Sequence, residues 1–144
     1  MSGLADQLPS SLAGVAVLII DDSEDTAEAL GLLLQQYGCD VRVALNGHQG
    51  LEMLKSFRAA LVLLDITMPD IDGYSVCRSI RADRGDAVYI VAVTGWAKDE
   101  DRHRALTAGF DDHVAKPVPL ERLIRLVERA SLKRHTAPFP GTSD

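Results

Sequence analysis

The sequence predicts a doubly wound α/β domain, in which helices cover both faces of a parallel sheet. Unbroken apolar runs at 15–20, 61–64 and 88–93 are typical of strands that are buried on both faces. Five strand segments alternate with five segments of helical periodicity along the chain. Right-handed crossovers between parallel strands then place helices on both sides of the sheet.

The first strand-helix unit begins with the run at 15–20, which ends on the acidic pair Asp21-Asp22. Ser23 can cap the following helix and Gly38 can end it. The apolar residues of this helix recur at helical spacing, and they are Ala27, Leu30, Leu33, Leu34 and Tyr37.

The second unit pairs an alternating strand at 39–44 with a short helix that begins after Asn46-Gly47. The alternation of apolar and polar residues predicts a strand near an edge of the sheet. The inward-facing residues of the short helix and the segment after it are Leu51, Leu54 and Phe57.

The third unit holds the strand at 61–65, which ends on Asp65. Met68-Pro69 stops the strand, and a turn at 70–73 leads into a helix at about 72–82. Asp65 should therefore lie at the carboxyl end of a central strand, where open α/β sheets place their chemistry. Taken alone, an aspartate there is more often a helix cap or a turn former, and the rest of the chain decides between the two interpretations.

The fourth strand, at 88–93, closes on Thr94-Gly95 and precedes an unusually polar helix at about 98–108. Few apolar residues anchor this helix, and poorly anchored elements open most easily. Two interpretations stay open, a moving part or an ordinary solvated surface helix.

The fifth unit is a short strand at 112–115, followed by Lys116-Pro117 and a helix at about 119–132. A proline in the first turn favours the start of that helix. Its inner stripe consists of Leu120, Leu123, Ile124, Val127 and Ala130.

The length of 144 residues predicts one domain, at 14–132, between flexible tails at 1–13 and 133–144. The net charge of −6 and the lack of a basic run argue against direct nucleic-acid binding. Cys39 and Cys77 lie far apart, and no leader or membrane segment is visible. We therefore expect a soluble cytoplasmic protein with reduced thiols that contacts no membrane.

Polar groups able to bind ions follow four of the strands, and parallel strands bring their carboxyl ends to one edge. These groups are Asp21, Asp22, Asp65, Thr94 and Lys116. Carboxylates gathered there repel one another unless a cation shares them, and oxygen ligands suit Mg²⁺. The lysine and the threonine hydroxyl could hold phosphoryl oxygens, with Asp65 as the acceptor.

Together these residues, with the segment D-I-T-M-P-D-I-D-G at 65–73, resemble the receiver domain of bacterial response regulators of the chemotaxis-regulator type. The similarity covers about 15–131, and it implies the flavodoxin-like strand order 2-1-3-4-5. The segments T-G-W and G-F-D-D-H-V-A-K-P are also similar to receivers of hybrid sensor kinases.

The resemblance implies that Asp65 accepts a phosphoryl group from a histidine kinase or a histidine phosphotransfer protein. Asp22, Asp65 and the backbone carbonyl of Thr67 would bind Mg²⁺, or Mn²⁺ as a substitute, while Asp21 acts mainly through water. Lys116 would contact the phosphoryl group, and its bond to Pro117 would be cis.

Signalling would follow from the movement of Thr94, which reshapes the surface of the fourth helix, fifth strand and fifth helix. With no output domain, the protein would act on an unknown downstream protein, as a monomer or weak homodimer. No enzyme activity is expected beyond self-phosphorylation from small donors and self-dephosphorylation.

Two residues tune the common pattern. His113 stands where receivers often carry an aromatic switch residue, and it is either a polar switch or a structural histidine. Trp96 lies two residues after Thr94, where we expect it to screen the phosphoryl group from water or to contact a partner.

Three alternatives remain. A magnesium-dependent phosphatase of the haloacid dehalogenase type also uses a strand-end aspartate, but it resembles a D-x-D pattern that Thr67 breaks. A flavin-binding domain would need a phosphate loop where Asp21-Asp22 stands. A degenerate receiver is disfavoured because every chemical position is filled.

Overall fold

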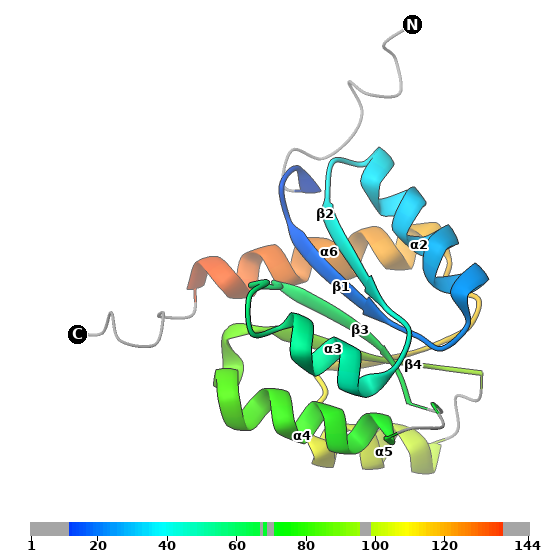
Figure 1. Ribbon diagram of the computed structural model, residues 1–144, viewed down its shortest axis with the longest axis vertical. Helices are drawn as coiled ribbons and strands as arrows, with labels where there is room; N and C mark the ends of the chain where they lie inside the picture. Colours follow the sequence, from blue (N-terminus) through cyan, green and yellow to red (C-terminus); the bar gives the residue numbers. More distant parts are fainter. Residues whose placement is uncertain (1–11, 67, 69–70, 96–98, 137–144) are drawn as a thin grey trace, which may run out of the picture.

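The computed structural model describes residues 12–66, 68, 71–95 and 99–136, which form a parallel sheet flanked by helices (Figure 1). The strand order β2-β1-β3-β4-β5 confirms the predicted topology. The elements in chain order are β1 (Ala16–Ile20), α2 (Glu24–Gln36), β2 (Asp40–Ala44), α3 (Gly47–Met53), β3 (Leu61–Asp65), α4 (Gly73–Arg84), the 3₁₀ turn η2 (Gly85–Ala87), β4 (Tyr89–Thr94), α5 (Asp99–Ala108), β5 (Asp112–Ala115) and α6 (Leu120–Thr136). None of these helices is both long and apolar enough to cross a membrane.

Two hydrophobic cores lie on opposite faces of the sheet. Val17 and Ile19 of β1 belong to the core under α2 and α6, whereas Leu18 and Ile20 belong to the core under α3, α4 and α5. Successive side chains of a strand point to opposite faces, so each buried strand needs apolar residues at every position. This explains the unbroken apolar runs in the sequence.

Side-chain caps begin three of the helices. The N–H of Thr26 donates to Ser23 Oγ at 3.4 Å, that of Gln49 to Asn46 Oδ1 at 2.8 Å, and that of Ser75 to Asp72 Oδ1 at 2.9 Å. Each cap satisfies a backbone donor that has no partner within its helix. The predicted cap at Ser23 is thereby confirmed.

The folded domain is longer at both ends than the predicted range of 14–132. Leu12 is fully buried in the core under α2 and α6, and its carbonyl accepts from the N–H of Val15 at 3.3 Å. Helix α6 continues through Thr136, since no proline or glycine follows Leu132 before that point. The remainder of both predicted tails lies outside the described residues.

Asp111 joins several elements at the amino-terminal ends of the strands, opposite the ends that carry Asp65 and Thr94. Its carboxylate accepts from Arg81 of α4 at 2.6 Å, from the N–H of Ile90 in β4 at 2.8 Å, and from Lys133 of α6 at 2.8 Å. Charge-assisted hydrogen bonds of this kind are stronger than neutral ones. The cluster ties α4, β4 and α6 to the start of β5.

Gly73 brings the first turn of α4 against the residue that follows β3. A Cβ atom at Gly73 would lie 2.5 Å from Ile66 Cα, and backbone cannot move aside as a flexible side chain can. We predict that Gly73→Ala lowers the free energy of unfolding by about 1–3 kcal/mol, as measured by urea denaturation.

Gly31→Ala on α2 is the matched control, because its Cβ would meet only side chains, the nearest at 3.5 Å. Removing a helical glycine there should leave stability unchanged or raise it by up to about 1 kcal/mol. Equal effects of the two substitutions would contradict the close approach at Gly73.

Both cysteines are buried, and burial raises the pKa of each thiol from 9.0 to about 11. A shift of this size lowers the thiolate fraction about a hundredfold at pH 8, and the thiolate is the reactive form. We predict that iodoacetamide labels native Cys39 and Cys77 at least tenfold more slowly than the urea-unfolded chain, as followed by intact mass. Rapid labelling of the native protein would show that the thiols are accessible.

Candidate functional site

The carboxyl ends of four strands converge on one edge of the sheet, as the sequence predicts. Asp21 follows β1, Asp65 ends β3, Thr94 ends β4 and Lys116 follows β5. Backbone hydrogen bonds continue the ladders past the strands, since the N–H of Asp21 donates to Ala44 O at 3.0 Å and that of Lys116 to Thr94 O at 2.7 Å. The sheet register therefore holds these residues at one level.

Three carboxylates form the centre of the site. Oxygens of Asp21, Asp22 and Asp65 all lie within 4.8 Å of one another. Asp21 and Asp65 are each only 2% exposed, whereas Asp22 faces solvent. An all-oxygen donor set with one open side fits Mg²⁺, which binds to one or two carboxylates and keeps several waters.

Lys116 is the cation of this cluster. Its Nζ lies 3.0 Å from Asp21 Oδ2 and 3.4 Å from Asp65 Oδ2, so one ammonium group bridges the two buried carboxylates. Burial lowers the pKa of Lys116, but the hydrogen bonds and charges of Asp21 and Asp65 outweigh it and leave the pKa above its ordinary value. Lys116 is therefore protonated at neutral pH.

Opposing effects act on the pKa of Asp21. Burial raises its pKa, while hydrogen bonds from the Ser23 N–H at 2.9 Å and from Lys116 lower it, and the nearby charge of Asp65 raises it again. The net result is a pKa above the ordinary value of an aspartate. Burial is the largest cause of this rise, and a divalent cation shared by the three carboxylates would stabilise their charged forms.

The structure describes some of the remaining predicted residues and not others. Thr94 is 2% exposed at the end of β4, next to Ala115 of β5. His113 is 6% exposed and pairs in register with Ala92, so its imidazole belongs to the protein interior. The Lys116–Pro117 peptide bond is cis. Thr67 and Trp96 lie outside the described residues.

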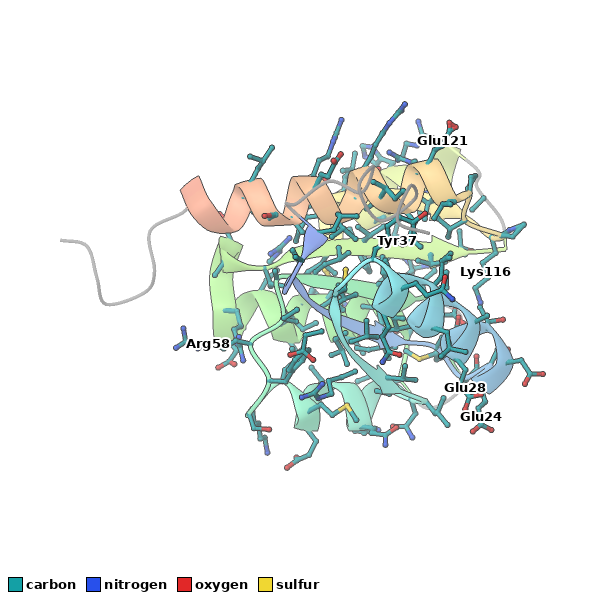
Figure 2. The ribbon with its side chains drawn as sticks, turned by 90° about the horizontal axis from the view of Figure 1, so that it is seen from above. Glu24, Glu28, Tyr37, Arg58, Lys116 and Glu121 are labelled. Carbon is teal, nitrogen blue, oxygen red and sulfur yellow. The ribbon has the colours of Figure 1, made fainter. Side chains whose placement is uncertain are left out.

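A pocket of about 520 Å³ opens beside the carboxylates, and no pattern in the sequence predicts it. It lies between α2 and the segment after β5, and Figure 2 shows Lys116 at the same end of the molecule as Glu24 and Glu28 of α2. The lining is mostly apolar, with Lys116 at the carboxylate side, and comprises Asp25, Thr26, Ala29, Leu30, Val93, Lys116, Pro117 and Val118. This lining comes from α2, β4 and the residues after β5, which lie far apart in the sequence.

Comparisons with known proteins identify the family of this chain. The model of the response regulator receiver domain matches residues 17–128. An uncharacterised 14.6 kDa protein from the sodA1 3′ region of Leptolyngbya boryana is 36% identical over 85% of this chain and 94% of its own length. The response regulator MprA of Mycolicibacterium vanbaalenii is 35% identical over 90% of this chain, which spans only 55% of that regulator.

Among solved structures, a CheY-like receiver domain protein from Methanospirillum hungatei superimposes with a TM-score of 0.79 at 25% identity. The match covers 85% of this chain and 98% of that one. The domain therefore has the fold of solved receiver domains. The chain belongs to the response regulator receiver domain family.

Proposed function

We propose that the chain accepts a phosphoryl group on Asp65, with Mg²⁺ bound beside it, and passes the signal to another protein. A histidine kinase or a histidine phosphotransfer protein is the proposed donor, and the α5-β5-α6 surface is the proposed output. The observation that carries this proposal is the contact of one lysine with two buried carboxylates, inside a cluster of three.

In the proposed step, an Asp65 carboxylate oxygen forms a bond to the phosphorus while the bond from phosphorus to the donor atom breaks. The donor atom is an imidazole nitrogen of phosphohistidine or a carboxylate oxygen of a small acyl phosphate, and it leaves with the bonding electron pair. The product is a mixed anhydride on Asp65. Transfer of this kind needs positioning and charge neutralisation more than covalent machinery.

Lys116 and Thr94 would supply the neutralisation that belongs to the chain itself. The Lys116 ammonium, 3.4 Å from Asp65 Oδ2, is within reach of an oxygen on a phosphoryl group at that carboxylate. The hydroxyl of Thr94, at the end of the adjacent strand, can donate to a second oxygen. Bound Mg²⁺ would neutralise further negative charge on the transferring group.

The pocket between α2 and the segment after β5 fits the proposed protein donor. It exposes apolar groups immediately beside Lys116, so a partner that covers it would reach Asp65 and exclude water. Small acyl phosphates need no such contact, which allows the chemistry to be tested without the natural partner.

We predict that the purified chain, incubated with Mg²⁺ and acetyl phosphate, gains the mass of one phosphoryl group. The gain should be absent in Asp65→Asn and after chelation of the metal, because the acceptor or the cation is then missing. Intact-mass spectrometry measures all three samples. A gain that persists in Asp65→Asn would place the acceptor elsewhere.

Asp22→Asn should weaken Mg²⁺ binding about tenfold or more, as measured by isothermal titration calorimetry, because a charged ligand of the metal is lost. Asp25→Asn is the matched control, since Asp25 is an exposed aspartate three residues away and lies outside the carboxylate cluster. Equal loss of affinity in both variants would indicate a general effect of charge and would contradict the assigned site.

A further inference from the structure

Helix α5 is weakly anchored to the domain. Among its residues with described side chains, 102–108, only Ala105 and Ala108 are buried, and Leu106 is 56% exposed. Two alanine methyl groups bury little apolar surface compared with the leucines and valines of the other helices. A contact of another kind must therefore contribute to the position of this helix.

Arg104 supplies such a contact with the neighbouring helix α4, which lies beside α5 (Figure 1). Its guanidinium carbon lies 4.0 Å from the centre of the Tyr74 ring, within the range of a cation–π interaction. Arg104 itself is solvent-exposed, yet the ring that it covers is 5% exposed. The same ring meets Phe110 edge-to-face, with centroids 6.1 Å apart. Tyr74 thus holds α5 near its middle and just after its end.

Tyr74 is also fixed to the strand that carries the proposed phosphoacceptor. Its neighbour Gly73 packs against Ile66 so closely that no Cβ would fit, and Ile66 directly follows Asp65. The N–H of Ile66 donates to Val93 O at 3.3 Å, which ties this point to β4. A displacement at Asp65 would reach Tyr74 through backbone in direct contact, because tightly packed groups transmit displacement.

We propose that the Arg104–Tyr74 contact is a latch, which holds α5 in the position seen here and whose release favours phosphorylation of Asp65. The regulatory half of this inference rests on the proposed function, whereas the latch itself does not. Arg104 and Tyr74 act as positioning residues, since neither touches the carboxylate cluster. In the proposed phosphorylation-competent form α5 is displaced, so weakening the latch increases the population of that form.

Hydrogen exchange tests the latch. Arg104→Ala should speed amide exchange in residues 99–108 about two- to fivefold, the factor that matches loss of one exposed cation–π interaction. Arg102→Ala is the matched control, because it removes the same charge from an exposed position on the same helix. Tyr74→Phe keeps the ring and its contacts with Arg104 and Phe110, so it should behave as the wild type. Tyr74→Leu removes both contacts and should speed exchange at least as much as Arg104→Ala.

The initial rate of phosphorylation by acetyl phosphate tests the regulatory half. Arg104→Ala and Tyr74→Leu should each raise this initial rate by the factor by which that variant speeds exchange. The double variant should be phosphorylated no faster than Tyr74→Leu alone. Tyr74→Phe and Arg102→Ala should leave the rate unchanged. The agreement between exchange and phosphorylation is a result that a purely structural contact would not produce.

The two proposals can fail separately. Equal exchange in Arg104→Ala and Arg102→Ala overturns the latch, whatever the phosphorylation result. Faster exchange with an unchanged phosphorylation rate overturns the regulatory half and leaves the proposed function intact. A wild type that is never phosphorylated overturns the proposed function and the regulatory half together, while the exchange data still decide the latch.

Discussion

The structure depends on the charge balance between Lys116 and the buried carboxylates of Asp21 and Asp65. Two carboxylates that are 2% exposed would repel each other strongly, and the ammonium group within 3.0 Å and 3.4 Å of them offsets part of this cost. Asp22 adds a third negative charge at the open side. The arrangement leaves an excess of negative charge that a divalent cation can share, and a place where added phosphoryl oxygens meet positive charge.

The rest of the fold holds these groups in register. Parallel pairing of β1 with β3, and of β3 with β4, sets the relative height of the strand ends. The two cores need apolar residues on both faces of each central strand, so the first polar side chains appear where the strands leave the core. Arg81, Asp111 and Lys133 connect α4, β5 and α6 at the other edge of the sheet. Asp65 and Thr94 thus end strands of the sheet, and Asp21 and Lys116 directly follow strands.

Sequence patterns predicted most of this fold because the strands are short, apolar and bounded by polar residues. The strands at 61–65 and 112–115 were predicted with the bounds that the structure has, and the edge position of β2 followed from its alternation. The convergence of Asp21, Asp65, Thr94 and Lys116 followed from parallel topology alone. The predicted end of α6 at 132 was wrong because no apolar residue of the inner stripe follows Ala130 at helical spacing, and Leu12 was missed because it stands alone.

Contacts between helices could not be predicted in the same way. The stacking of Arg104 on Tyr74 joins residues 30 positions apart through the relative placement of two helices, which periodicity does not encode. The polar helix at 98–108 was open to two interpretations. Helix α5 exposes Leu106, as a surface helix does, and the interpretation as a moving part stays a prediction. The pocket beside Lys116 likewise arises from three segments that meet only in the folded chain.

Chemical location of the acyl phosphate tests the central claim most directly. Borohydride reduces an aspartyl phosphate to homoserine, so the chain can be phosphorylated with acetyl phosphate and Mg²⁺, reduced, digested and sequenced by tandem mass spectrometry. The proposed acceptor role of Asp65, beside Lys116, predicts homoserine at position 65. Homoserine at position 21 or 22, or at a site remote from Lys116, would contradict it.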